Sequence, residues 1–277
     1  MTQVVNLSDA TIHAHVLDDV AARAAAVVAD RRGARGVLSW LDRKLRFAGD
    51  ELLDRQDTPA GVKSRILADV DRLTRLLQLE RYWLWRMGKM IEAARLARQG
   101  KPVRVLDVGS GTGKLLFAVE KWARKRRIPV ELHGLDHTEV AVEQARRTAA
   151  AEGHRVHFRH GDARALAHLG NGSVDVAVTT FMLHHLPPGD VARVLSELDR
   201  VAAFDFFAFD LRRNLPTLPA LWAVLHVGGF EAPSRHDSLA SLRRGYTPAE
   251  IEEILRAAGV PRFTVQSLPP VFYDVSR

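Results

Sequence analysis

A turn rich in glycine carries the most informative chemistry in this sequence. Gly109, Gly111 and Gly113 directly follow the apolar, β-branched run 103–108, and the apolar residues of 115–119 come next. Such a run predicts a buried strand, and the residues after the turn predict a helix. Glycine lets a backbone approach a ligand closely, and a helix N-terminus offers free N–H groups to it. We therefore expect the turn to cradle a nucleotide-like cofactor.

The spacing of these glycines excludes two common nucleotide loops. A GxGxxG dinucleotide fingerprint would need its third glycine at position 114, which is Lys114. A P-loop, GxxxxGK[ST], would need glycine at Val108 and a hydroxyl side chain at Leu115. The pattern DxGxGxG over residues 107–113 remains, at the end of a first predicted strand.

Acidic residues follow the next two predicted strands. Asp136 ends the segment 130–136, about 20 residues past the glycine turn, where a carboxylate can bind both ribose hydroxyls of a cofactor. The alternative for Asp136 is a capping role at the helix that starts near Thr138. A third strand is predicted within 155–163 and ends in Gly161-Asp162-Ala163.

A metal site is not expected from the sequence. There is no cysteine, which excludes disulfides and thiolate ligands. His154, His157 and His160 are spaced by three, and residues three apart on a strand point to opposite faces of the sheet. His157 therefore cannot join the other two, and we predict no bound metal.

Two adjacent histidines follow a fourth predicted strand, 174–180. The segment after it begins Phe181-Met182-Leu183 and continues through His184 and His185 to a proline pair. An imidazole that titrates near neutral pH suits the removal of a hydroxyl proton, so either histidine is a candidate general base. The alternative is that the pair only shapes this loop.

Together, the glycine turn, the two acids and the segment after the fourth strand resemble those of class I S-adenosylmethionine (SAM)-dependent methyltransferases, over about residues 103–277. Segment 181–188 is similar to that of small-molecule enzymes of the ubiquinone/menaquinone-biosynthesis type. It lacks the (D/N)PP(Y/F) motif of nucleic-acid and protein amino-methyltransferases. The resemblance implies methyl transfer from SAM, leaving S-adenosylhomocysteine (SAH), to O, N or C of a small molecule, with a phenol or hydroxyl favoured.

The resemblance also assigns roles to individual residues. It places Asp107 at the amino-acid end of SAM, Asp162 and Ala163 at the adenine, and Thr180 and Phe181 beside the sulfonium. It further suggests that Arg86 reaches the methionine carboxylate. The expected cofactor-binding residues are Asp107, Gly109, Ser110, Gly111, Gly113, Asp136, His137, Asp162, Ala163, Thr180, Phe181 and Arg86, and the candidate catalytic residues are His184 and His185.

The order of the predicted elements defines the fold. Strands and helices alternate from residue 101, which indicates parallel βαβ units. With the resemblance, we expect an α/β, Rossmann-like domain over 101–277: a seven-stranded, mostly parallel sheet with one antiparallel strand. A hairpin of segments 263–267 and 271–275 closes the sheet, and an insertion at about 212–245 forms a substrate cap.

Residues 1–100 are predicted to be helical and to serve as a lid or a dimerisation region. We expect helices up to about Asp30, over 37–53, and from Thr58-Pro59 through the aromatic segment 82–85. Thr-Pro predicts a capping hydroxyl with proline at the first helical position, and Thr247-Pro248 repeats this signal with a glutamate completing a capping box. The aromatic side chains either pack this helix onto the sheet or roof the pocket.

Composition limits the remaining function classes. The 277 residues are 47% hydrophobic and 26% charged, as in ordinary globular proteins. Neither a secretory signal nor an apolar span is visible, so we expect a cytoplasmic protein without a membrane partner.

The net charge of +7 invites a nucleic-acid partner. Its densest cluster, 121–127, ends a predicted helix, where cations are favoured, so we do not expect one. Two alternative functions stay open: an rRNA or tRNA methyltransferase, and a non-catalytic partner subunit. A homodimer formed through the N-terminal helices stays open as an oligomeric state.

Overall fold

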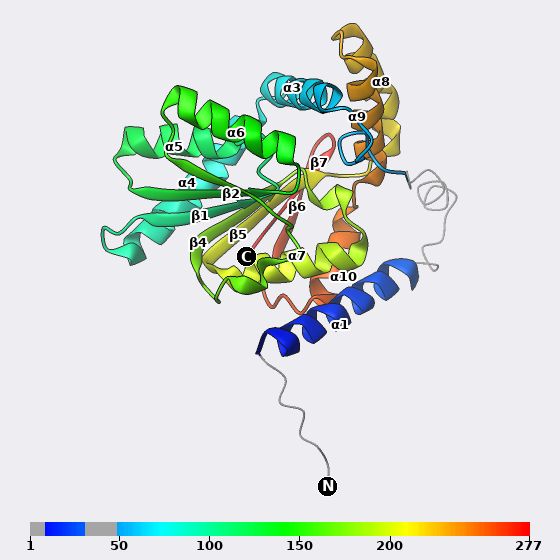
Figure 1. Ribbon diagram of the computed structural model, residues 1–277. Helices are drawn as coiled ribbons and strands as arrows, with labels where there is room; N and C mark the ends of the chain where they lie inside the picture. The colour runs from blue at the N-terminus through cyan, green and yellow to red at the C-terminus, as the bar shows by residue number, and fades with distance from the viewer. Residues whose placement is uncertain (1–8, 31–48) are drawn as a thin grey trace.

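A computed structural model describes residues 9–30 and 49–277 of the chain (Figure 1). The strands are β1 (Val103–Val108), β2 (Val130–Asp136), β3 (Val156–His160), β4 (Val174–Thr180), β5 (Ala202–Leu211), β6 (Thr264–Leu268) and β7 (Phe272–Ser276). The α-helices are α1 (Asp9–Asp30), α3 (Ala60–Leu76), α4 (Leu79–Arg98), α5 (Lys114–Arg126), α6 (Glu139–Glu152), α7 (Pro188–Val201), α8 (Leu218–Val227), α9 (Ala232–Arg244) and α10 (Pro248–Ala257). Short 3-10 turns are η2 (Leu166–His168), η3 (Leu183–His185) and η4 (Leu215–Thr217).

The strands form one 7-stranded sheet in the order β3-β2-β1-β4-β5-β7-β6. Strands β1 to β5 pair in parallel, whereas β7 is antiparallel to both β5 and β6. The predicted fold class, the single antiparallel strand and the closing hairpin are therefore confirmed. The strand order reverses at β1, which lies between β2 and β4, and ligands of open α/β sheets bind outside the carboxyl ends of strands at such a point.

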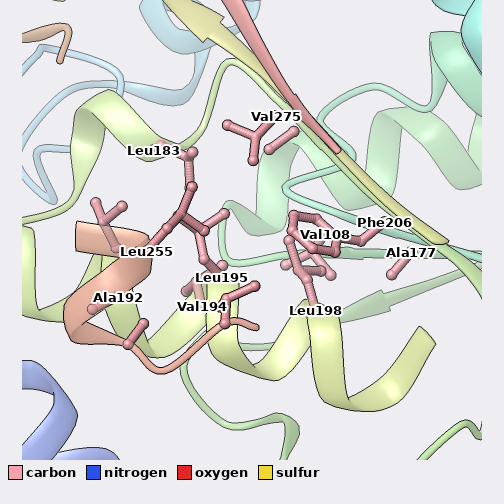
Figure 2. Packing of buried hydrophobic residues seen from close by; sticks show 14 of the residues in the cluster. Val108, Ala177, Leu183, Ala192, Val194, Leu195, Leu198, Phe206, Leu255 and Val275 are labelled. Carbon is pink, nitrogen blue, oxygen red and sulfur yellow. The ribbon is translucent and has the colours of Figure 1, made fainter. Parts of the chain in front are cut away.

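Helices cover both faces of the sheet. One apolar core joins the sheet to α4, α5 and α6, and the other joins it to α1, α7 and α10 (Figure 1). Figure 2 shows the second core, in which Leu195 and Leu198 of α7 and Leu255 of α10 pack toward Phe206 and Val275. Because helices cover both faces, β4 is buried along nearly its whole length, including Asp175 and Thr179.

A third group of helices lies beyond the carboxyl ends of the parallel strands. Helix α3 packs against α9, and α9 packs against α8 (Figure 1). The side chain of Arg65 in α3 pairs with Glu231 at 2.9 Å, and Arg72 donates a hydrogen bond to the carbonyl of Gly228. The structure thus brings part of the N-terminal helical region into contact with the 212–245 insertion. None of the helices in the described ranges has the length and apolar character to cross a membrane.

The N-terminal helices differ from the sequence prediction in two places. Helix α1 ends at Asp30 as expected, but most of the predicted 37–53 helix lies outside the described residues, and 49–53 form a bend and a turn. The predicted helix through the aromatic segment is split into α3 and α4. Gln78 adopts φ 53°, a left-handed conformation that interrupts the helical hydrogen bonding between them.

The two Thr-Pro signals start their helices differently. Thr247 caps α10 in a complete capping box: its side chain accepts from the Glu250 N–H, and the Glu250 carboxylate accepts from the Thr247 N–H. Helix α3 begins one residue later than predicted, with Pro59 at the N-cap and no side-chain cap hydrogen bond from Thr58. The same dipeptide therefore caps one helix and merely precedes the other.

We expect Thr247→Ala to lower the free energy of unfolding by about 1 kcal/mol, the usual cost of losing a capping hydroxyl. Thr58→Ala is the matched control and should cost less than about 0.5 kcal/mol, because its hydroxyl caps nothing. Urea denaturation followed by circular dichroism measures both. Equal losses in the two variants would contradict the capping assignment.

Candidate active site

The glycine turn adopts a conformation that few other residues tolerate. Gly109 has φ 78° and Gly113 has φ 82°. A Cβ at Gly113 would lie 2.4 Å from the Phe158 ring, and one at Gly109 would lie 2.8 Å from the Met182 side chain. Both the backbone angle and the available space therefore require glycine. Helix α5 starts at Lys114, immediately after the turn.

Asp136 fastens this turn to the second strand. The Gly111 N–H donates to Oδ2 of Asp136 at 2.7 Å, and the Thr138 N–H donates to Oδ1 at 2.8 Å. The carboxylate is buried and lines a cavity, with lone pairs left for ribose hydroxyls. The local bond to Thr138 that the sequence suggested coexists with a position suited to the cofactor.

Asp107 lies at the end of β1 with one oxygen unsatisfied. It is 1% exposed, lines the same cavity, and its Oδ1 has no hydrogen-bond partner among the described residues. Burial, with a further contribution from the Asp136 charge, raises the pKa of Asp107 to about 8. At neutral pH the group is an uncharged acid, able to ionise when a cation such as the amino group of SAM arrives.

The cavity encloses about 260 Å³ between the sheet and the α3–α9 cap. Helices α3 and α4 contribute mostly apolar side chains to its lining, including Ile66, Leu67 and Trp83, whereas α9 contributes mostly polar ones, including Asp237 and Ser241. Ten residues expected from the sequence line it: Asp107, Gly109, Ser110, Gly111, Asp136, His137, Thr180, Phe181, His184 and His185. The structure thus gathers most of the predicted site around one cavity.

Phe181 holds an unusual backbone angle at this cavity. Its φ is 55°, which is uncommon for a residue with a side chain, and such angles cluster at functional sites. Its ring meets Trp83 edge-on at 5.6 Å and Phe209 at 5.5 Å. Trp83 therefore both packs α4 onto the sheet and lines the pocket, whereas Trp85 is 52% exposed.

Four predicted residues are not among those lining the cavity. They are Gly113, Asp162, Ala163 and Arg86. Gly113 belongs to the glycine turn, and the Asp162 carboxylate pairs with Arg164 at 2.7 Å. Hydrogen bonds from Arg164 hold the pKa of Asp162 below its usual value. The adenine role of Asp162 and Ala163 stays a prediction.

The Arg86 side chain does not line the cavity in which the resemblance placed it. Its guanidinium lies 3.8 Å from the Asp274 carboxylate and over the Phe207 ring, at β7 and β5. Among the described residues that line the cavity, the lysine is Lys114, which pairs with Asp71 of α3 at 3.1 Å and so connects α3 to the glycine turn. The position of Arg86 gives no support to a contact with the methionine carboxylate.

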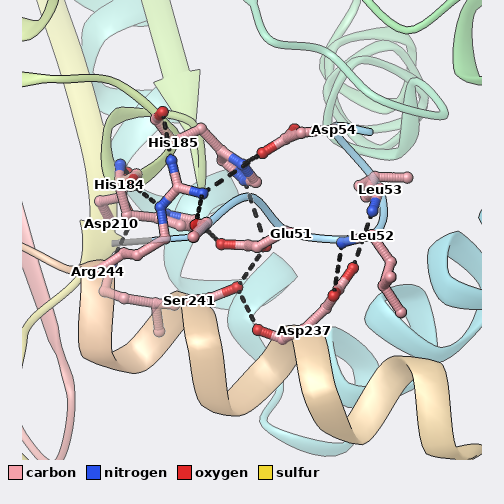
Figure 3. Close-up of polar contacts among 12 residues, drawn as sticks. Glu51, Leu52, Leu53, Asp54, His184, His185, Asp210, Asp237, Ser241 and Arg244 are labelled. Atoms are coloured by element: carbon pink, nitrogen blue, oxygen red, sulfur yellow. Dashed lines mark hydrogen bonds and ion pairs between the residues drawn. The ribbon is translucent and has the colours of Figure 1, made fainter. Parts of the chain in front are cut away.

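His184 and His185 are each oriented by a carboxylate. Nδ1 of His184 lies 2.5 Å from Oδ1 of Asp210 at the end of β5, and Nδ1 of His185 lies 2.6 Å from Oδ2 of Asp54 (Figure 3). Arg244 donates to both histidine carbonyls, at 3.1 and 2.6 Å. With Nδ1 engaged, each ring is left with Nε2 for other partners.

Glu51 completes this group, although sequence reasoning missed it. Oε1 lies 3.8 Å from Nε2 of His184, and Oε2 lies 3.9 Å from Nε2 of His185. The carboxylate is 3% exposed, and Ser241 of α9 donates to Oε2 at 2.7 Å (Figure 3). No local signal marks Glu51 or Asp54, because their positions depend on α9, far along the chain.

These neighbours set the charge of His185. Burial alone would lower its pKa, but the carboxylates of Glu51 and Asp54 outweigh burial and raise the pKa to about 9. Burial likewise opposes ionisation of Asp54, yet His185 and Arg244 hold its pKa below the usual value. The end of the cavity beside His184 and His185 is therefore a charged cluster, unlike the neutral Asp107 beside the glycine turn.

Comparisons with known proteins agree with this fold. Residues 105–204 match a family described as a methyltransferase domain. The chain is 34% identical over 141 residues to a demethylmenaquinone methyltransferase of Thermus thermophilus, a match that covers 50% of this chain and 59% of that protein. It is 25% identical over 227 residues to the ubiquinone/menaquinone biosynthesis C-methyltransferase UbiE of Rhodopseudomonas palustris, covering 78% and 88%. The fold is similar to that of the plantazolicin methyltransferase BpumL in complex with SAH, with a TM-score of 0.60 and 14% identity over 87% of this chain and 98% of that one.

SAH affinity should rise with pH up to about pH 8. Below its pKa of about 8 the free Asp107 is protonated, and pairing with the ligand ammonium requires it to lose that proton. We expect the Kd at about pH 6.5 to be roughly tenfold weaker than at about pH 8. Calorimetry in buffers of different ionisation enthalpy would detect the proton release. Asp107→Asn should flatten the pH dependence, and a flat profile in the unaltered protein would exclude this role.

Asp136→Ala should weaken SAH binding by about 1–3 kcal/mol, because it removes the acceptor for ribose and the anchor of the turn. Asp162→Ala is the comparison: its carboxylate is already paired with Arg164, so we expect a smaller loss. Calorimetric titration, with melting curves as a test of folding, measures both. A larger loss for Asp162→Ala would reverse the assigned order of the two acids.

Proposed function

We propose that this chain, which is a SAM-dependent methyltransferase of the class I, small-molecule type, transfers the methyl group to a hydroxyl oxygen of an apolar, phenol-like acceptor. The observation that carries the proposal is the group Glu51, His184 and His185 at one end of a cavity to which α3 and α4 contribute mostly apolar side chains. Such a cavity selects an apolar body and meets its polar atom at one place.

The residues at the glycine turn suit SAM. A buried acid with an unsatisfied oxygen, Asp107, suits its ammonium, and Asp136 suits its ribose. SAM supplies an activated methyl group whose departure leaves a neutral thioether. The protein therefore has to align the two reactants and to exclude water. The α3–α9 cap, which covers the cavity, suits both tasks.

An oxygen acceptor is favoured by the histidines. A hydroxyl must lose its proton as the new bond forms. His184 is buried and His185 is half-buried, and both are oriented by carboxylates and located on the cavity wall. We propose that His184 assists the loss of that proton, since the carboxylates of Glu51 and Asp54 keep His185 protonated at neutral pH. Similarity alone does not select the atom, since one relative named above is a C-methyltransferase.

Phenols related to quinone precursors are the first acceptors to test. The relatives' names point to such compounds, and the apolar side chains of α3 and α4 in the cavity suit their rings. A cytoplasmic location and pairing of two chains through the N-terminal helices remain predictions from the sequence.

With methyl-labelled (¹³C) SAM and a panel of phenols, hydroxy acids and quinone precursors, we expect NMR of the product to show an O–CH₃ signal. His184→Gln should lower kcat by about 10²–10⁴-fold while leaving SAH affinity unchanged. His157→Gln, at an exposed histidine outside the cavity lining, is the control and should keep full activity. A C–CH₃ or N–CH₃ product, or transfer only to RNA, would overturn the proposal.

A further inference from the structure

We propose that Glu51, His184 and His185 form a binding site for one divalent transition-metal ion, of the class of Zn²⁺, at the acceptor end of the cavity. The existence of the site follows from the geometry of these residues. Its use in methyl transfer rests on the proposed function.

The three side chains offer converging donor atoms. Each contributes one nitrogen or oxygen, and these atoms lie within 4.8 Å of one another. Both histidines have Nδ1 engaged, and each Nε2 lies within 4 Å of a Glu51 oxygen, at 3.8 and 3.9 Å. Ligands at about 2.0–2.2 Å from one Zn²⁺ are roughly 3–4 Å apart, so small side-chain rotations close the site, and the ion takes the place of the Nε2 proton of His185.

Each histidine also has the outer partner that metal-binding histidines usually have. Such a histidine donates its other ring N–H to a carboxylate or carbonyl, which fixes its tautomer and orientation. Asp210 occupies this position for His184, and Asp54 occupies it for His185 (Figure 3). A single His–carboxylate pair would suffice for a general base. Two pairs that face one buried carboxylate indicate a shared ligand.

Glu51 supplies an independent observation. It is 3% exposed, and its Oε1 has no hydrogen-bond partner in the described part of the chain. A buried carboxylate oxygen without a partner is costly, and a cation would satisfy it. Asp54 and Asp210 add two further carboxylates, which pair with the histidines. The cluster also contains the guanidinium of Arg244, which lies near Asp54. The excess of acidic groups favours a dication.

Helix α9 holds the ligand segments in place. The Asp237 carboxylate accepts from the N–H groups of Leu52 and Leu53, at 2.8 and 3.0 Å, and Ser241 donates to Glu51. Arg244 donates to the carbonyls of both histidines. The ligands are therefore held by a second layer of contacts, as a specific metal site requires.

The ligand types indicate the kind of ion. Two imidazoles and one carboxylate suit Zn²⁺ or Fe²⁺, whereas Mg²⁺ and Ca²⁺ prefer oxygen ligands alone. Three protein ligands leave a coordination position for a hydroxyl oxygen of the acceptor, since all three residues line the cavity. A cation there favours loss of the hydroxyl proton to water. The O–CH₃ bond then forms as the S–CH₃ bond breaks, and its electron pair stays on sulfur.

The sequence prediction of no metal considered only histidines that are close in sequence. His154 instead stacks on Phe117 and bonds Glu120, and His160 bonds a backbone carbonyl. The cluster proposed here joins residue 51 to residues 184 and 185, which only the fold brings together.

The test uses the full chain without an affinity tag, treated with a chelator and dialysed against Zn²⁺, with metal content measured by mass spectrometry. We expect one Zn²⁺ per chain, and Co²⁺ in its place should give visible absorption typical of nitrogen and oxygen ligands. Glu51→Gln and His185→Gln should each weaken Zn²⁺ binding at least about 100-fold, and Asp210→Asn should weaken it about 10–100-fold.

His157→Gln and Glu152→Gln, at exposed positions outside the cavity lining, should leave Zn²⁺ affinity unchanged. SAH titration of every variant reports whether the domain is folded. Less than one Zn²⁺ per chain in protein that binds SAH, or equal affinity in Glu51→Gln, would overturn the site. O-methylation that persists without metal would remove the ion's role and keep the proposed function, whereas Zn²⁺ binding without any transfer would do the reverse.

Discussion

The side-by-side pairing of β1 and β4 is the constraint on which the site depends. Because both strands run in the same direction, their carboxyl ends open on the same edge of the sheet. The glycine turn that follows β1 and the 181–185 segment that follows β4 therefore face one cavity. The chain between them is free to form two further strands and helices without separating them. The proposed cofactor contacts and the proposed acceptor contacts thus come from different segments yet share one wall.

The α3–α9 cap is held in place by polar contacts as well as by apolar burial. Burying Glu51, Asp210 and Asp237 would cost several kcal/mol for each charge if they lacked partners. Backbone N–H groups, Ser241 and the histidines supply those partners, and each of them comes from a different segment. Removing one member leaves another buried group unpaired, so the network defines one arrangement of the cap.

Local patterns predicted the elements whose determinants lie close together in the sequence. The run 103–108, the glycine spacing and the Thr247 capping box each act within a few residues, and the structure contains all three elements. The break at Gln78 was missed because the apolar periodicity continues through it, and backbone angle alone separates α3 from α4. Glu51 was missed for a different reason. Its neighbours Asp237 and Ser241 lie far along the chain, and no local pattern records such pairing.

The two ends of the cavity show how neighbours decide the effect of burial. Burial opposes charge on Asp107 and on His185 alike. Beside Asp107 the nearest charge is another carboxylate, Asp136, so the pKa rises further and the acid is neutral. Beside His185 the charges are Glu51 and Asp54, which have the opposite sign, so the imidazolium persists. The fold thus presents a protonated acid at the proposed cofactor end and a surplus of carboxylates at the proposed acceptor end. One apolar cavity can therefore hold a sulfonium donor and an oxygen acceptor in different electrostatic surroundings.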